Sequence, residues 1–308
     1  MIAKNPSDNR KYHYPVLFFD KARDALKAVL KELRKQGDFT LFMPAYIGIS
    51  PKEGSGIFDP IQELGITYRF YHINREILID VEDFEQLLSS TQGRKVVLLV
   101  DYFGYVDKAY EQINRIAHNH GAVVIEDAAH ALFTDYVDGI AGRKSDYTIY
   151  SLHKMFAVGK GGMLRVRMSE SQEMQLSGQG DFKWNGADYD LAGISLRRKE
   201  NAVLWEELLN QCESIEILRS SDKYAGQTPQ TFPVLLHGYD RFQLYQDLNE
   251  RGYGIVSLYH TMIEPLNKLE FKESLYVAER IINFPVHQDI EKKDILEMYN
   301  AFEEIIIK

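Results

Sequence analysis

Hydrophobic and polar residues follow two patterns along the chain. Short runs rich in apolar residues, typical of strands that are covered on both faces, occur over Thr40–Met43, Lys95–Asp101, Ala122–Asp127, Asp146–Ser151 and Gly162–Met168. Between some of these runs, apolar residues recur at helical spacing. The alternation of strand and helix predicts a mostly parallel central sheet flanked by helices.

Two helices are predicted within this first part of the chain. The first begins after Asp20, whose side chain can cap a helix N-terminus, and ends at Gly37. The second covers Lys108–His118, and the segment between Gly48 and Gly56 is predicted to be a loop.

The pattern changes after Met168. The segment Ser169–Ser195 is polar and rich in Gly and Asp, which predicts a long loop. Helices are then predicted over Asn201–Cys212, Tyr239–Arg251 and Lys292–Ile307, and strands over Phe232–His237 and Gly254–Leu258. We therefore expect two domains, a large domain over residues 1–195 and a smaller α+β domain over residues 196–308.

Composition restricts the class of protein. The 308 residues are 45% hydrophobic and 26% charged, as in ordinary globular proteins, with a net charge of -9. The acidic balance disfavours nucleic acid and anionic membranes as partners, and the single cysteine, Cys212, indicates a reducing compartment. The sequence shows no signal-peptide core, no run long enough to span a membrane and no zinc-ligand spacing, so we expect a cytoplasmic protein without a metal site.

Candidate chemistry lies at the predicted strand ends. Asp101, Asp127 and Ser151 end three of the apolar runs, and ligands of such sheets bind beside the carboxyl ends of the strands. Lys154 follows Ser151 closely and precedes a glycine-rich turn over Gly159–Gly162. Each residue alone is most often a turn, cap or solvated side chain, whereas their common order and strand context indicate a site.

These segments resemble a known family. EDAAHAL, which contains Asp127 and His130, and KMFAVGKGG, which begins at Lys154, are similar to the acid and lysine segments of the DegT/DnrJ/StrS sugar-nucleotide aminotransferases. Weaker resemblances extend over residues 41–46, 65–80, 101–105, 252–266 and 282–290. The resemblance implies an aspartate-aminotransferase-like fold of the fold type I pyridoxal-phosphate enzymes.

The resemblance also implies a cofactor, pyridoxal 5'-phosphate, and residues that hold it. Lys154 would carry the cofactor as a Schiff base and move protons as general base and acid, which requires an amine that loses its proton readily. Asp127 would pair with the pyridine nitrogen and keep the ring an electron sink. His130 would lie near the phenolic oxygen, and Ser151 would hold the phosphate.

Two parts of the predicted site depart from the family. Where many members carry Ser-Gly-Thr at the start of the first helix, this chain has Lys21-Ala22-Arg23, so Ala22 and Arg23 are the candidate phosphate contacts. Arg23 either replaces the missing hydroxyl with a charge-assisted contact or is a solvent-facing helix charge. Tyr46 is the candidate for stacking on the cofactor ring, with a core tyrosine as the alternative.

The expected activity is transfer of an amino group from a donor such as glutamate to a keto-sugar nucleotide. A homodimer is implied by the same resemblance. The alternatives are a desulfurase, which would need Cys212 as a mobile nucleophile, a dehydratase with His153 in the place of the lysine, and a binding or regulatory relative without activity. Arg197 and Arg198 are either substrate-anion contacts or a solvated pair.

Overall fold

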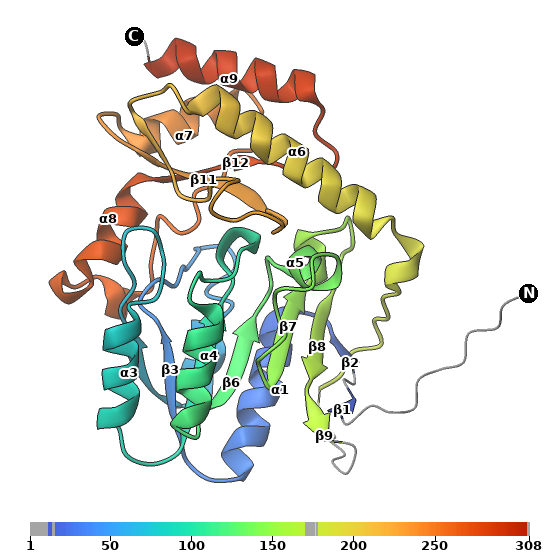
Figure 1. Cartoon of the computed structure of the whole chain (residues 1–308), viewed down its shortest axis with the longest axis vertical. Coiled ribbons are helices and arrows are strands. Elements are labelled where there is room, and N and C mark those ends of the chain that lie inside the picture. Colours follow the sequence, from blue (N-terminus) through green and yellow to red (C-terminus); the bar gives the residue numbers. More distant parts are fainter. Residues whose placement is uncertain (1–11, 14–15, 170–175, 177, 307–308) are drawn as a thin grey trace, which may run out of the picture.

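The computed structural model describes residues 12–13, 16–169, 176 and 178–306, and a seven-stranded sheet forms its centre (Figure 1). Strands β3 to β7 are parallel to one another. At one edge β8 pairs antiparallel with β7, and β2 pairs antiparallel with β8. The predicted mostly parallel sheet is therefore confirmed. In spatial order the strands are β2 (Val16–Phe19), β8 (Gly162–Val166), β7 (Tyr147–Ser151), β6 (Val123–Asp127), β5 (Lys95–Val100), β3 (Thr40–Pro44) and β4 (Thr67–Tyr71).

Helices cover both faces of this sheet. On one face α1 (Ala22–Lys35) and α2 (Phe58–Glu63) bury their apolar side chains against β3, β5, β6, β7 and β8. On the other face α3 (Val81–Ser90) and α4 (Tyr110–Asn119) pack over β3, β5 and β6 (Figure 1). Because both faces are buried, the strands need nearly continuous apolar sequence, as observed. The short helix α5 (Leu132–Tyr136) follows β6.

The C-terminal part forms a second layer with its own core. A three-stranded antiparallel sheet, β10 (Ile215–Ile217), β11 (Thr231–Leu236) and β12 (Ile281–Pro285), packs against α6 (Leu191–Leu209), α7 (Arg241–Glu250) and α9 (Lys292–Ile306). Trp205 of α6 and Phe284 of β12 stack with ring centroids 4.3 Å apart at its centre. The helix α8 (Lys272–Arg280) precedes β12 and packs into the core of the larger part.

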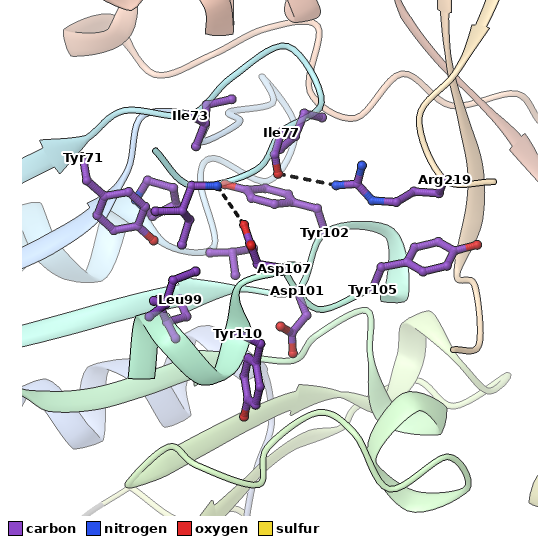
Figure 2. Close-up of a pocket in the computed structure, with 14 residues that line it drawn as sticks. Tyr71, Ile73, Ile77, Leu99, Asp101, Tyr102, Tyr105, Asp107, Tyr110 and Arg219 are labelled. Atoms are coloured by element: carbon purple, nitrogen blue, oxygen red, sulfur yellow. Dashed lines mark hydrogen bonds between the residues drawn. The ribbon is translucent and has the colours of Figure 1, made fainter. Parts of the chain in front are cut away.

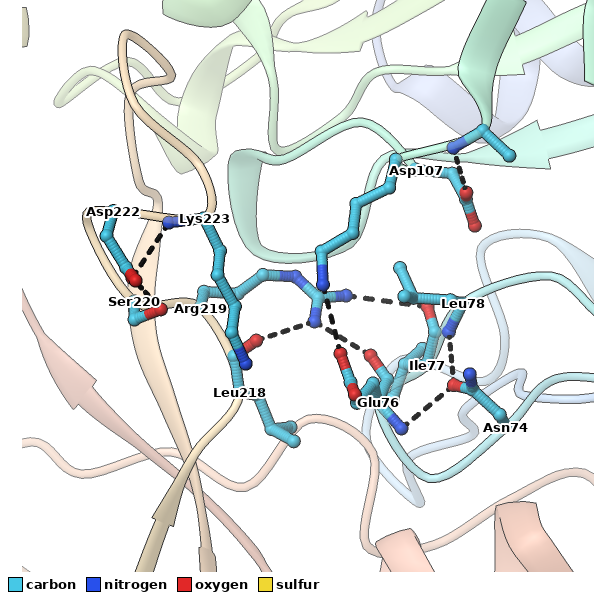
Figure 3. Close-up of polar contacts among 12 residues, drawn as sticks. Asn74, Glu76, Ile77, Leu78, Asp107, Leu218, Arg219, Ser220, Asp222 and Lys223 are labelled. Atoms are coloured by element: carbon cyan, nitrogen blue, oxygen red, sulfur yellow. Dashed lines mark hydrogen bonds and ion pairs between the residues drawn. The ribbon is translucent and has the colours of Figure 1, made fainter. Parts of the chain in front are cut away.

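One buried arginine joins the two parts of the chain (Figure 3). Arg219, just beyond β10, donates to the backbone oxygens of Glu76 at 2.7 Å and Ile77 at 3.4 Å, in the turn that precedes α3. Asn74 closes that turn by accepting from the N–H groups of Glu76 and Leu78. The turn therefore depends on a side chain from a distant part of the sequence.

The start of α1 differs from its prediction. Lys21 rather than Asp20 precedes the first helical residue, and the Lys21 N–H donates to the Asp24 carboxylate at 3.1 Å. Asp20 instead forms an ion pair with Lys160 at 2.6 Å. The expected cap was therefore wrong, because a cation from the glycine-rich turn binds the candidate capping side chain.

Two C-terminal predictions also need correction. The loop expected over residues 169–195 ends early, because α6 begins at Leu191 with Asp190 accepting from the Gly193 N–H at 2.9 Å; residues 170–175 and 177 of that loop lie outside the described residues. The strand expected over 254–258 is only an isolated bridge between Val256 and Asn283. The Asn283 side chain accepts from the Leu258 N–H at 2.8 Å and thus replaces the next ladder bond.

The remaining predicted elements are present with shifted ends. The helix predicted over 108–118 is α4, that over 201–212 lies within α6 apart from its end, and that over 239–251 is α7. The helix predicted to reach Ile307 is α9, whose last described residue is Ile306. The expected domain boundary after Ser195 falls inside α6. A short antiparallel pair, β1 (Tyr12–His13) with β9 (Met168–Ser169), lies apart from the main sheet, and none of the described helices is long and apolar enough to cross a membrane.

Candidate active site

A cavity of about 360 Å³ lies where the carboxyl ends of the parallel strands meet the start of α1. Its walls come from the ends of β5, β6 and β7, from the loop 47–57, and from residues 257–261 of the C-terminal part. Of the residues predicted from sequence, the cavity brings together Lys154, Asp127, His130, Ser151, Ala22 and Arg23. Tyr46 is not among the residues that line it.

Lys154 and His130 form a close pair inside the cavity. The Lys154 Nζ atom lies 2.8 Å from His130 Nε2, and the Phe103 N–H donates to His130 Nδ1 at 3.3 Å. Because Nδ1 accepts this bond, the neutral imidazole carries its proton on Nε2 and donates toward the lysine. Only an amine without its third proton can accept that bond, so the pair favours neutral Lys154.

Burial shifts both groups of this pair toward their neutral forms. Loss of solvation lowers the pKa of the Lys154 amine, against the opposing charges of Asp127 and Glu53. Loss of solvation and the charge of Lys154 lower the pKa of His130 well below its usual range. The Lys154 residue as a whole is exposed, because much of its side chain faces the open cavity. Its amine at the end of the side chain is in contact with the buried His130. A neutral, accessible amine is the form that attacks carbonyl groups.

Asp127 ends β6 with its carboxylate in the cavity. Its Oδ1 atom accepts the Ala129 N–H at 2.9 Å, and the residue is half-buried. Burial raises the pKa of the Asp127 carboxyl, while the nearby charge of Lys154 and the Ala129 N–H lower it. A cation brought against this carboxylate would therefore restore its charged form, and a protonated ring nitrogen supplies such a cation.

The start of α1 forms one end of the cavity, and its free backbone N–H groups are suited to an anion. Lys21, Ala22 and Arg23 line it, and the positive end of the helix dipole is directed there. Ser151, at the end of β7, is buried beside it with its hydroxyl 3.3 Å from His153 Nδ1. Gly162 permits this arrangement, since a Cβ atom at that position would overlap the Lys21 carbonyl group.

The Arg23 side chain holds a loop at the edge of the cavity. Its guanidinium donates to the Glu53 carbonyl at 2.7 Å and forms an ion pair with Asp59 at 3.3 Å. The Asp59 carboxylate also accepts the Ser55 N–H at 3.0 Å. Arg23 therefore anchors the loop that carries Glu53, a contact that neither alternative from the sequence anticipated.

Tyr46 supports the opposite wall from behind. It is fully buried, and its hydroxyl donates to the Leu258 carbonyl at 3.1 Å and accepts the Tyr259 N–H at 2.7 Å. Tyr259 itself lines the cavity, and its ring contacts the space where Gly48 has no side chain. The structure thus places Tyr46 among the core tyrosines and Tyr259 at the cavity surface.

Several cavity residues were not identified as site residues from the sequence. Glu53, His153, Tyr259 and His260 line the cavity together with Lys154. Only His153 lies within the motif that identified Lys154, and loss of solvation lowers its pKa. The others come from loops whose approach to the strand ends depends on tertiary packing.

Asp101 and Glu126 form a pair of buried acids near Asp127, and Figure 2 shows Asp101 of this pair among the residues that line a small cavity. Asp101 is 2% exposed and lines both the main cavity and a small enclosed one of about 20 Å³. Burial and the neighbouring Glu126 raise the pKa of Asp101 well above its usual range. Glu126 is fully buried and accepts the Tyr110 hydroxyl at 2.8 Å and the Gly142 N–H at 2.6 Å. We infer that Asp101 keeps its proton and donates a hydrogen bond to the carboxylate of Glu126.

Comparison with known proteins gives one matching family model and several relatives. The sequence model of the "DegT/DnrJ/EryC1/StrS aminotransferase family" matches residues 56–180, which include Asp127, His130, Ser151 and Lys154. The chain is 32% identical over 142 residues to the spore coat polysaccharide biosynthesis protein SpsC of Bacillus subtilis, covering 44% of this chain and 36% of that protein.

Two further relatives extend the similarity over most of the chain. The UDP-4-amino-4,6-dideoxy-N-acetyl-beta-L-altrosamine transaminase of Campylobacter jejuni is 22% identical over 274 residues, covering 75% of this chain and 71% of that protein. The structure of Helicobacter pylori PseC, an aminotransferase involved in the biosynthesis of pseudoaminic acid, superposes with a TM-score of 0.74 at 16% identity, covering 95% and 86%. The structural match establishes the shared fold.

Proposed function

Because the chain is related to the DegT/DnrJ/EryC1/StrS aminotransferase family, we propose that it is a pyridoxal-phosphate-dependent aminotransferase. The observation that carries the proposal is the assembly of Lys154, His130 and Asp127 in one cavity that ends at the start of α1. Sugar-directed relatives support a keto-sugar nucleotide as the acceptor. An amino acid such as glutamate is the donor that we propose.

The residues present fit the cofactor. The start of α1 and the Ser151 hydroxyl suit its phosphate. Asp127 suits its ring nitrogen, because the positive charge of a protonated nitrogen would lower the carboxyl pKa that burial raises. His130 lines the same cavity, with Nε2 2.8 Å from the amine of Lys154. When bound, the cofactor supplies an electron sink that stabilises negative charge at the carbon bearing the transferred amine.

The chain's own residues would handle the protons. Lys154 Nζ would accept the proton that leaves the amine-bearing carbon of the donor, as general base. In the second, reverse half of the reaction it would deliver a proton to the acceptor carbon that gains the amine, as general acid. Because burial lowers the pKa of its amine, a larger fraction of Lys154 is neutral at a given pH than for a solvated lysine. His130 Nε2 holds the amine in place between these transfers.

The alternative activities receive less support from the site. Cys212, required for a desulfurase, packs against the C-terminal core and is not among the residues that line the cavity. His153, the dehydratase candidate, lines the cavity, but it is the adjacent Lys154 whose terminal nitrogen contacts His130. A purely binding role would leave the neutral amine without a purpose.

The decisive experiment is capture of the cofactor by Lys154. The purified protein is incubated with pyridoxal phosphate and reduced with borohydride, and the modified residue is identified by mass spectrometry. We expect the label on Lys154, a visible absorbance band before reduction, and loss of both in Lys154→Ala. Lys160→Ala, an exposed lysine of the same segment, is the control and keeps both.

Turnover then tests the reaction class. The loaded protein with glutamate should release 2-oxoglutarate, and a keto-sugar nucleotide should gain the mass of an amino group in exchange for its keto oxygen. Labelling of residues at random, or of Lys160 as strongly as Lys154, would refute the proposal.

A further inference from the structure

Arg198 is a buried cation that the proposed reaction does not use. It is 2% exposed within α6, whereas the preceding Arg197 has half of its side chain exposed and lies 3.8 Å from Glu200. Among the described residues Arg198 has no carboxylate within ion-pair distance, and its guanidinium lies 5.1 Å from the Phe133 ring. Burial lowers the pKa of Arg198 to about 10, and only the charge of Asp289 opposes this shift.

A charge in such a place requires an explanation, because burying a cation against neutral partners seldom adds stability. The five N–H donors of a guanidinium form a rigid fork that can fix several acceptors at once. Arg198 directs these donors to two different segments, and each segment leads to the Lys154–His130 pair.

The first connection reaches the lysine segment. Arg198 donates through Nε at 3.1 Å and through a terminal nitrogen at 2.9 Å to the same oxygen, Gln288 Oε1. The amide of Gln288 then donates to the carbonyl of Met155 at 3.2 Å. Met155 directly follows Lys154, and its N–H donates to the Leu152 carbonyl at 2.9 Å in the turn that presents the lysine. Two bonds thus join the guanidinium to the residue after Lys154.

The second connection reaches the histidine. Arg198 donates to the carbonyls of Pro229 and Gln230, each at 3.4 Å, and the Gln230 N–H donates to the Phe103 carbonyl at 2.6 Å. Phe103 in turn donates its N–H to His130 Nδ1 at 3.3 Å.

In this second connection the backbone at Gly104 packs closely against the segment 228–230. A Cβ atom on Gly104 would lie 2.6 Å from the Thr228 carbonyl and 2.7 Å from the Gln230 nitrogen. Movement of the segment 228–230 would therefore displace Phe103 and its bond to His130.

We propose that Arg198 is a positioning residue that keeps Lys154 and His130 in contact. It holds Met155, which follows Lys154, through Gln288. It holds Phe103, which donates to His130, through residues 229–230. Its contribution to catalysis rests on the proposed aminotransferase function, whereas its effect on the Lys154 amine exists without the cofactor. Loss of Arg198 loosens the contact between Nζ and Nε2 and admits water to the amine.

The experiment measures the Lys154 amine directly in protein without cofactor. Arg198→Met and Gln288→Ala are compared with the wild type and with Arg197→Met, the matched control on the same helix. Each protein is labelled with acetic anhydride across a pH series, and the Lys154 peptide is quantified by mass spectrometry against the exposed Lys293. Asp127, Glu53, His130 and His153 face the amine and are unchanged in every variant.

We expect the labelling midpoint of Lys154 to rise by about one pH unit in Arg198→Met, a tenfold change in its protonation equilibrium. Gln288→Ala, which breaks one connection only, should shift it in the same direction by less, and Arg197→Met should leave it unchanged. An unchanged midpoint in a folded Arg198→Met protein would overturn the proposal.

Three further outcomes bear on the proposal. If Arg198→Met does not fold, Gln288→Ala decides, and a wild-type midpoint in that variant also overturns the proposal. If the wild-type protein never captures pyridoxal phosphate, the aminotransferase function fails while the labelling result still stands. Equal shifts in Arg198→Met and Arg197→Met would indicate a general effect of charge and would count against positioning.

Discussion

Three carboxyl groups lie close together at the ends of β5 and β6, and their surroundings assign them different tasks. Asp127 lies in the cavity beside Lys154, whose charge lowers the pKa that burial raises. Glu126 points to the other side of β6, as alternation along a strand requires, and receives the Tyr110 hydroxyl and the Gly142 N–H. Among the described residues no donor reaches Asp101 Oδ2, so Asp101 is the acid that keeps its proton.

Replacing Asp101 should change how stability depends on pH. The raised pKa of Asp101 means that the folded protein holds a proton that the unfolded chain releases above pH ~4. The free energy of unfolding contributed by this group therefore falls as pH rises from that value toward the raised pKa. Asp101→Asn removes this titration and can still donate to Glu126.

We therefore expect the difference in melting temperature, Asp101→Asn minus wild type, to increase steadily between pH 5 and pH 8. Glu250→Gln, an exposed carboxyl on α7, serves as the control and should follow the wild-type slope. A pH-independent difference would show that Asp101 is charged in the folded protein.

The site could be predicted from sequence where its residues share one local motif. Asp127, Ser151 and Lys154 lie at or just after the ends of β6 and β7, so strand ends and spacing singled them out, and the family resemblance added His130. Glu53 and Tyr259 belong to loops that no local pattern directs toward the strand ends. Tyr46 illustrates the limit, because an aromatic residue beyond a strand has the same sequence pattern whether it lines a cavity or lies behind one.

At the scale of elements, β8 lies close to the start of α1, and this close approach shapes the end of the cavity that suits an anion. Gly162 pairs with Phe19 of β2 and with Ser151 of β7, so three strands meet directly beside the first turn of the helix. An anion can reach the backbone N–H groups of that turn in this arrangement only because Gly162, the strand residue beside them, has no side chain.

Gly162→Ala should therefore destabilise the fold and weaken phosphate binding together. Overlap with the Lys21 carbonyl group is with backbone, so α1 must move, at a cost of about 1–3 kcal/mol in the free energy of unfolding. Affinity for pyridoxal phosphate and for inorganic phosphate, measured by calorimetry, should fall at least about tenfold, as expected for a lost charge-assisted contact. Gly159→Ala is the control, since its Cβ would meet no atom within 4 Å. Equal phosphate affinity in the two variants would contradict this role of α1.

The elements that could be predicted from sequence are those with a strong period. The buried strands and α1 were evident because one environment acts along their whole length. The first residues of α6 were missed because Ala192, Gly193 and Ser195 carry no apolar stripe, although Asp190 caps the helix. At 254–258 apolar residues suggested a strand, yet the side chain of Asn283 occupies the position of a ladder partner.

At the scale of the whole molecule, contacts such as those of Arg219 hold the C-terminal layer on the large sheet. The arginine is 3% exposed, and its guanidinium lies 4.9 Å from the centroid of the Tyr224 ring, which forms an edge contact with Tyr105 at 5.2 Å. Its bonds end on a turn in which Ile77 has a φ of 56°, a conformation that few β-branched residues adopt.

Arg219→Met should loosen this turn without disturbing the sheet. Two buried carbonyls lose their donor, which costs about 1–3 kcal/mol. Hydrogen exchange of the Leu78 and Ile79 amides should accelerate, while exchange at Val97 in the centre of β5 stays at the wild-type rate. Lys223→Met, an exposed residue on the same segment, is the control. Uniform acceleration throughout β5 would show that Arg219 stabilises the whole fold rather than the turn.

The pairing of β2 with β8 has a consequence for the order of events during synthesis. A ribosome releases the residues of β2 early, but their partner strand becomes available only after β3 to β7 have been made. Until then β2 has no neighbour in the sheet, and α1, which follows it directly, lacks the backbone contact at Gly162. We therefore expect a nascent chain that ends before β8 to show no affinity for phosphate, and cofactor capture to be a late step in the maturation of this protein.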